Sequence, residues 1–248
     1  MAGHSKWANI QHRKGAQDAK RGKLFTRFIR EITIAARSGL PDPAANPRLR
    51  LAVDKALGAN MSKDTIERAI KRGSGELEGV NYEEVRYEGY GIGGAAVMVD
   101  CMTDNRNRTV AELRKIFEKN NGVLGGAGAA AWAFDRKGVI TLEKGAATED
   151  KLMEVAVGAG ADDYSDEGEE WHLTMATDVL HVVGEALEAG GIKAKSSSMA
   201  YLPKAKKPLA GRDAEVALNL VDALDDHDDV QNVFADFDVS EEELQKLS

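Results

Sequence analysis

The sequence predicts an α+β protein of three domains: an N-terminal all-helical domain and two ferredoxin-like α/β domains, the third inserted into the second. Apolar residues recur at helical spacing in the first third of the chain, and strand and helix patterns alternate after it. One helix and one strand follow the second complete α/β pattern at the end of the chain. The expected parts are residues 1–79, residues 80–137 plus 208–240, the inserted residues 138–202, and a C-terminal tail, 241–248.

Three helices are expected in the first domain. The first covers residues 20–37, with an apolar face at helical spacing. Its opposite face is basic and is expected to be exposed: Lys20, Lys23, Arg27, Arg30 and Arg37. The second begins at Asn46, a capping residue followed by proline, and the third begins at Ser62 and ends at Gly73 as its glycine cap.

Strands and helices alternate after residue 80. Strands are expected at 85–90, 95–101 and 129–134, with a helix at 106–119. From residue 139 the pattern follows the order strand, helix, strand, strand, helix, strand, which is the ferredoxin-like order. The remaining helix, 213–224, and strand, 230–237, would complete the first α/β domain, which otherwise lacks them. Residues 204–208 would then be the return linker.

Charge is segregated along the 248-residue chain. The net charge is −8, yet residues 1–78 contain 16 basic and 8 acidic residues. A basic module that meets a polyanion and an acidic body that avoids it would explain this contrast. The composition is 43% hydrophobic with a single cysteine, and neither a membrane span nor a secretory signal is recognisable. We therefore expect a cytoplasmic protein without membrane contact.

The basic N-terminal arm is the best candidate for contact with nucleic acid. Its lysine and arginine side chains could neutralise phosphates, and Trp7 could stack on an unpaired base. The alternative is a solvated tail with Trp7 buried in the core. The candidate residues in the arm and the first helix are Lys6, Trp7, Arg13, Lys14, Lys20, Arg21, Lys23, Arg27 and Arg30.

Arg106 and Arg108 form a second candidate site, beside the start of a predicted helix in an otherwise acidic domain. Backbone amides at a helix start attract anions, and the guanidinium fork suits phosphate. The alternative, which the residues alone favour slightly, is a pair of salt bridges to neighbouring carboxylates.

No catalytic constellation is recognisable. The glycine-rich segment 122–128 precedes a strand and lacks both the P-loop lysine and the dinucleotide fingerprint, so no nucleotide cofactor is expected. The five histidines are scattered, and the acidic run 162–170 lacks the spacing of a calcium loop. We expect neither an enzyme nor a cofactor or metal site.

Several segments resemble the YebC family in the family's order. They are Met1 to Lys14 (MAGHSKWANIQHRK), Lys20 to Thr26 (KRGKLFT), Asn46 to Arg50 (NPRLR), Tyr87 to Gly91 (YEGYG), Thr103 to Thr109 (TDNRNRT) and Asp228 to Val233 (DDVQNV). Two departures stand out. Ile92 replaces the family's proline, and residues 125–130 (GGAGAA) replace a more polar segment, which puts a ligand role for hydroxyl groups there in doubt.

The resemblance implies three domains with the third inserted into the second. It also implies a DNA-binding transcriptional regulator. Some family members are instead described as translation factors that act at the ribosome and relieve proline-rich stretches, which is the alternative function. The expected partners are DNA, RNA or both, with the ribosome included. A protein partner for the acidic domains is left open.

Overall fold

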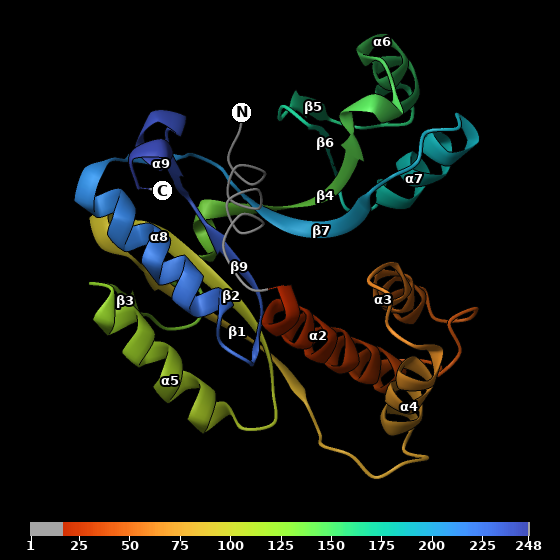
Figure 1. Ribbon diagram of the computed structural model, residues 1–248, viewed down its shortest axis with the longest axis horizontal. Helices are drawn as coiled ribbons and strands as arrows, with labels where there is room; N and C mark the ends of the chain where they lie inside the picture. Colours follow the sequence, from red (N-terminus) through yellow and green to blue (C-terminus); the bar gives the residue numbers. More distant parts are fainter. Residues whose placement is uncertain (1–16, 248) are drawn as a thin grey trace. The chain divides into compact units, whose positions relative to one another are not determined.

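The computed structural model describes residues 17–247 (Figure 1). These residues divide into two compact units. One contains the described residues up to Ala130 together with Ala210–Ala235, and the other contains Ala131–Leu209 and the residues from Asp236 onward. Among residues 17–247, no helix combines the length and the apolar character needed to cross a lipid bilayer.

The first unit begins with three helices: α2 (Gln17–Ser38), α3 (Pro47–Gly58) and α4 (Lys63–Ser74). Asn46 and Ser62 cap α3 and α4 as expected, because each side chain accepts a hydrogen bond from the backbone three residues later. Ile32 of α2, Leu49 of α3 and Ile66 of α4 meet in their common core.

The end of α4 differs from the expectation. Gly75, with a φ of +85°, is the left-handed cap, and Gly73 lies inside the helix and is buried. A side chain at position 73 would place its Cβ 2.4 Å from the carbonyl oxygen of Thr33. Gly73 therefore allows the backbones of α2 and α4 to approach closely.

The same unit contains a four-stranded antiparallel sheet (Figure 1). Its strands are β1 (Glu83–Tyr90), β2 (Ala96–Thr103), β3 (Val123–Leu124) and β9 (Val230–Ala235), in the order β3-β1-β2-β9. Helices α5 (Arg106–Lys119) and α8 (Gly211–Asp225) bury Phe117 and Leu220 against Val97 and Val99 of β2. β9 is thus an edge strand beside β2, although the whole segment 131–209 separates them in sequence.

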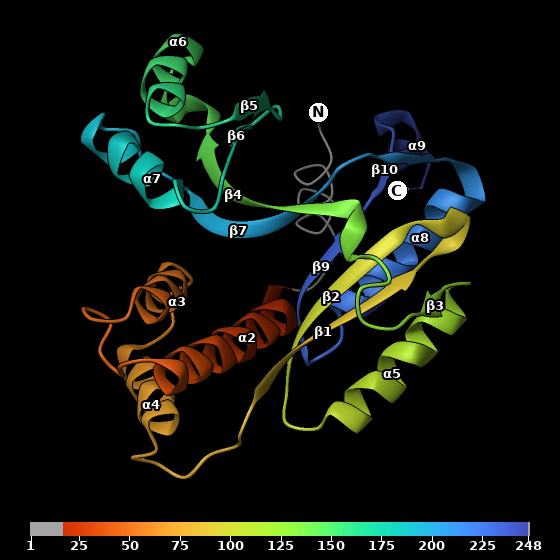
Figure 2. The same cartoon turned by 180° about the vertical axis from the view of Figure 1, so that it is seen from behind.

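The second unit contains another antiparallel sheet, with the order β5-β6-β4-β7 (Figure 2). Its strands are β4 (Phe134–Glu143), β5 (Asp163–Asp166), β6 (Glu170–Met175) and β7 (Ser196–Pro203). The core on one face is closed by α6 (Glu149–Leu152), the π-helical turn η4 (Met153–Val157) and α7 (Leu180–Ala189). This strand order is the one expected of the predicted inserted unit. The three-domain division itself stays a prediction.

Two of the expected strands have other bounds or another conformation in the structure. Residues 129–134 do not form a strand; Ala131–Ala133 form a 3₁₀ turn (η2), and β4 begins at Phe134. The expected strand 230–237 ends at Ala235, and a short strand β10 (Phe237–Val239) pairs in parallel with β8 (Lys207–Leu209). Most of the expected tail forms the helix α9 (Glu241–Leu247).

The close approach at Gly73 gives a stability prediction. We expect Gly73→Ala to lower the free energy of unfolding by about 1–3 kcal/mol, because the new methyl group must displace the backbone of α2. Gly58→Ala is the matched control, since no atom lies within 4 Å of its added Cβ, and it should change stability by no more than about 0.5 kcal/mol. Urea unfolding of both variants measures the difference, and equal effects would contradict the packing argument.

Candidate nucleic-acid interface

The basic face of α2 packs against an acidic turn that joins α8 to β9. The ammonium group of Lys23 lies 3.1 Å from a carboxylate oxygen of Asp226, and Arg27 lies 3.1 Å from a carboxylate oxygen of Asp225. Arg30 lies 2.9 Å from Asp229. Three successive turns of α2 thus each contribute one cation to one turn of the α/β part of this unit.

Arg30 corrects a sequence-based expectation, because it is buried and does not face solvent. Only 9% of the residue is exposed. Its Nη1 donates to the carbonyl oxygens of Met102 and Asp228, at 3.0 and 2.6 Å, and its guanidinium lies 5.1 Å from the ring centre of Tyr82. The helical period placed Arg30 opposite the apolar face correctly, but the sheet-containing part of the same unit covers that side.

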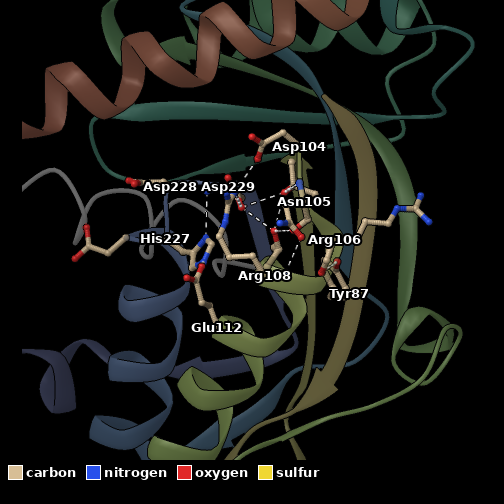
Figure 3. A network of polar contacts seen from close by, with 12 residues as sticks. Tyr87, Asp104, Asn105, Arg106, Arg108, Glu112, His227, Asp228 and Asp229 are labelled. Carbon is tan, nitrogen blue, oxygen red and sulfur yellow. Dashed lines mark hydrogen bonds and ion pairs between the residues drawn. The ribbon is translucent and has the colours of Figure 1, made fainter. Parts of the chain in front are cut away.

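Asp229 is the centre of the network that Figure 3 shows. One carboxylate oxygen binds Arg30; the other accepts hydrogen bonds from Arg108 at 2.8 Å and from the hydroxyl groups of Thr109 and Thr103 at 2.7 and 3.2 Å. Only 1% of Asp229 is exposed. Burial alone would raise its pKa, but these hydrogen bonds and the two guanidinium charges outweigh burial and lower the pKa.

The segment that follows β2 is folded to present these donors. The side chain of Asn105 caps α5 by accepting from the amide of Arg108 at 3.0 Å. The amide of Asn105 in turn donates to the Thr103 hydroxyl at 2.9 Å, and the oxygen of the Thr109 hydroxyl lies 2.7 Å from the same oxygen. The cap therefore holds Thr109 and Arg108 on the first turn of α5, pointing at Asp229.

Arg106 and Arg108 are engaged with carboxylates. Arg106 pairs with Glu83 at 2.8 Å, whereas Arg108 binds both Asp104 and Asp229. The hydrogen bond to Asp229 is the main reason that the pKa of Arg108 is raised. These are ion pairs of the kind that the salt-bridge alternative expects, and phosphate contact by the two arginines stays a prediction.

His227 extends the network to its other side. Its Nδ1 accepts the amide hydrogen of Asp229 at 3.1 Å, and its Nε2 lies 2.9 Å from a carboxylate oxygen of Glu112 (Figure 3). An imidazole with Nδ1 as acceptor and Nε2 as donor satisfies both contacts. His227 thereby links the acidic turn to the middle of α5.

A hollow of about 310 Å³ lies beside α2, at the edge of this network. The side chains of Lys23, Arg27 and Arg30 line it, together with His227 and Asp228. Its cations already carry the ion pairs described above, so the hollow offers little uncompensated positive charge.

Backbone amides of the glycine-rich loop before β4 bind a carboxylate of the protein itself. Glu88, which is 6% exposed, accepts hydrogen bonds from the amides of Gly128 and Ala130 at 3.0 and 2.7 Å. These amides are therefore engaged with an internal anion, and they are unavailable to a sheet ladder. This explains why residues 129–134 do not continue as a strand.

The remaining candidate residues precede Gly22, the first residue whose side chain the structure describes. Lys6, Trp7, Arg13 and Lys14 lie outside the described residues. Lys20 and Arg21 belong to α2, but the description of side chains begins at Gly22.

The sequence-based search missed Asp229 and the acidic turn. The run Asp225-Asp-His-Asp-Asp229 was a usable signal, because a dense acidic run suits a basic helix of the same chain.

In the part of the chain that the structure describes, no three histidine, cysteine, aspartate or glutamate side chains are grouped to hold a metal ion. The one thiol, Cys101, is buried, and burial raises its pKa to about 12.

The burial of Arg30 predicts a large effect of its replacement on stability, whereas the sequence alone predicts an exposed residue and a small effect. We expect Arg30→Met to lower the free energy of unfolding by about 3 kcal/mol, because it leaves the Asp229 carboxylate buried beside one guanidinium fewer. Lys23→Met should cost less than about 1 kcal/mol, since its ion pair with Asp226 is largely exposed. Urea unfolding at pH 7 compares the two, and similar small losses would contradict the structural role of Arg30.

The lowered pKa of Asp229 predicts how stability depends on pH. An unfolded aspartate titrates near about pH 3.9. The contribution of Asp229 is therefore fully present above that pH and is lost as the pH falls through its lower folded-state pKa. The stability difference between the wild type and Asp229→Asn should stay constant between pH 5 and 8 and shrink below about pH 4. Urea unfolding across this pH series tests it; a difference independent of pH would be the contrary result.

Two family models cover nearly the whole chain. The TACO1/YebC protein N-terminal domain matches residues 5–76, and the TACO1/YebC second and third domain matches residues 82–237. Among similar proteins, one of Geobacter sulfurreducens, called a probable transcriptional regulatory protein, is 56% identical over 247 residues and covers 100% of both chains. Another of the same description, from Acidithiobacillus ferrooxidans, is 55% identical and covers 100% of this chain and 98% of its own.

A solved structure agrees with these matches. The crystal structure of a conserved hypothetical protein from Aquifex aeolicus has a TM-score of 0.87 and 43% sequence identity, and the match covers 95% of this chain and 98% of that one. Matches of sequence and structure at this level extend over both units. The chain belongs to the TACO1/YebC family.

Proposed function

We propose that this protein is a nucleic-acid-binding regulator of gene expression that acts on transcription by binding DNA. The observation that carries the proposal is the match, over the full length, to relatives described as probable transcriptional regulatory proteins. The separation of charge supports it, since residues 1–78 carry 16 basic and 8 acidic side chains in a chain whose net charge is −8.

The contact with phosphate is proposed for the arm and the start of α2, from Lys6 to Arg21. The five other candidate cations form ion pairs with carboxylates of the protein itself: Lys23, Arg27, Arg30, Arg106 and Arg108. Breaking the pairs that Arg30 and Arg108 form with the buried Asp229 to bind a phosphate would cost several kcal/mol, which phosphate contacts would have to replace. The arm contributes Lys6, Arg13 and Lys14 within its first 14 residues.

The paired cations are proposed to anchor α2. Arg30, and to a lesser degree Arg27, fix the helix against the acidic turn, so the start of α2 is held at a defined place on its unit. Lys23 differs from them because its ion pair is 42% exposed on the lysine side. An exposed pair of this kind is worth at most about 1 kcal/mol, so Lys23 can exchange Asp226 for a phosphate.

The proposed action is binding without catalysis, in the cytoplasm. Each histidine of the described part has a glutamate neighbour: Glu170 for His172, Glu185 for His181 and Glu112 for His227. The buried thiol of Cys101, with its raised pKa, fits a reducing compartment and an inert structural role.

A salt titration with the full chain tests the proposal. The probes are a labelled 30-base-pair DNA duplex and a structured RNA of similar length. Replacing Lys6, Arg13 and Lys14 by glutamine should reduce the slope of log K against log salt by about two to three units, because each lost phosphate contact removes about 0.7–0.9. The matched control replaces Lys63, Lys71 and Arg72, three exposed cations of α4, and should leave the slope within one unit.

The result also separates the two functions that the family suggests. Tighter binding to the duplex supports the transcriptional role, whereas a clear preference for structured RNA would favour the translation-factor alternative. A flat salt dependence, or equal effects of the arm and control substitutions, would mean that the arm is not the contact surface.

A further inference from the structure

The second unit has a basic end, although it is acidic as a whole. Residues 138–200 contain 4 basic and 13 acidic side chains. The two segments that flank them, 132–137 and 201–207, contain five basic residues and one acidic residue, Asp135. The basic residues are Arg136, Lys137, Lys204, Lys206 and Lys207. We call these five residues the basic patch; three of them, Lys204, Lys206 and Lys207, belong to the return linker expected from the sequence.

These two segments are brought together by a two-stranded ribbon. β6 pairs with β4 only from Gly138 to Glu143, whereas β7 pairs with β4 from Phe134 onward. The first residues of β4 and the last of β7 thus extend beyond the four-stranded part of the sheet, as Figures 1 and 2 show. Arg136 lies directly opposite Tyr201 on this ribbon.

An exposed tryptophan stands at the end of the ribbon. Trp132 is 65% exposed, the largest fraction among the bulky apolar residues of the described chain. The amide of Lys204 donates to the carbonyl oxygen of Ala133 at 2.9 Å, so the lysine-rich segment begins next to the backbone of the residue that follows Trp132. The other tryptophan of this unit, Trp171, is 4% exposed and belongs to its core.

Two cations of the patch have partners of their own: Lys137 lies 2.8 Å from the Asp162 carboxylate, and Lys207, which lies in β8, also has a partner. The other three are weakly neutralised. Lys204 lies 3.6 Å from the Asp135 carboxylate, a long and exposed pair. The Nη2 of Arg136 donates to the sulfur of Met199 at 3.1 Å, which is a weak and uncharged acceptor. Within residues 22–247, no carboxylate forms an ion pair with Arg136 or Lys206. This differs from the α2 face, where each described candidate cation is matched by an aspartate.

We propose that this patch binds unpaired nucleotides, with one base stacked on Trp132 and the flanking phosphates held by Arg136, Lys204 and Lys206. An exposed ring within a group of cations is the combination that recognises single-stranded nucleic acid, because every base offers a face for stacking. A paired duplex hides its base faces, so Trp132 would have no base to stack on. The patch would serve loops, bulges or melted strands.

The proposal rests on the proposed function, to which it adds a second contact and a class of ligand. It concerns residues of the second unit alone, whereas the arm precedes α2. Experiments can therefore tell the two proposals apart. If the wild-type protein binds no nucleic acid, both proposals are wrong. If binding depends on the arm but not on Trp132, only the proposal for the patch is wrong.

The test compares Trp132→Phe with Trp132→Leu in the full chain. Both replacements are apolar and exposed, but only phenylalanine keeps a ring. The probes are a labelled 12-nucleotide RNA, the DNA of the same sequence and the corresponding DNA duplex. Trp132→Leu should weaken binding of the single strands about tenfold, the size expected for one lost stack, and Trp132→Phe should stay within about threefold of the wild type. Duplex affinity should be unchanged in both.

Charge substitutions test the cations. Replacing Lys204 and Lys206 by glutamine should reduce the salt slope for single strands by about 1.4, because each contact with a single strand contributes about 0.7. Lys151→Gln, on α6 of the same unit, is the control and should leave the slope unchanged. Equal single-strand affinities of the leucine and phenylalanine variants, or an equal loss on duplex and single strand, would overturn the proposal. The ratio of RNA to DNA affinity identifies which single strand the patch prefers.

Discussion

A buried carboxylate held between two guanidinium groups connects the helical and the sheet-containing parts of the first unit. Asp229 stands at the start of β9, Arg30 comes from α2 and Arg108 comes from the first turn of α5. A carboxylate with 1% exposure is tolerated only because these charges and the hydroxyl groups of Thr103 and Thr109 compensate for the lost water. The position of α2 relative to the first sheet depends on this compensation.

The same pairing changes what the separation of charge along the chain means. The sequence places an excess of basic residues at one end and of acidic residues at the other, which suggests an external polyanion. Part of that excess is satisfied inside the molecule, where Asp225, Asp226 and Asp229 meet three cations of α2. The phosphate contacts are therefore proposed for the arm and, in the second unit, for the ribbon next to Trp132.

Local signals in the sequence predicted the elements well, and non-local contacts account for the differences. The helix expected at 106–119 has the same bounds in the structure, and the caps at Asn46 and Ser62 are confirmed, because a cap depends on its own few residues. The burial of Arg30 was not predictable from helical spacing, which separates two faces but does not show what covers each. The failure at 129–134 has the same origin, since Glu88 comes from a different strand. Within the site, the candidate residues could be named, but the internal partners of the α2 cations lie about 200 positions away, and Asp229 lies 121 positions from Arg108.

That separation has a consequence for how the protein is made. Arg27 and Arg30 meet partners 198 and 199 positions later in the chain, and β9 joins the first sheet only after the whole segment 131–209 has been synthesised. A ribosome adds about 5–20 residues each second, so α2 waits at least ten seconds or so for its anchor. During that interval Arg27 and Arg30 lack the partners that they have in the folded unit. The acidic turn then pairs with them, and β9, which follows it directly, completes the first unit.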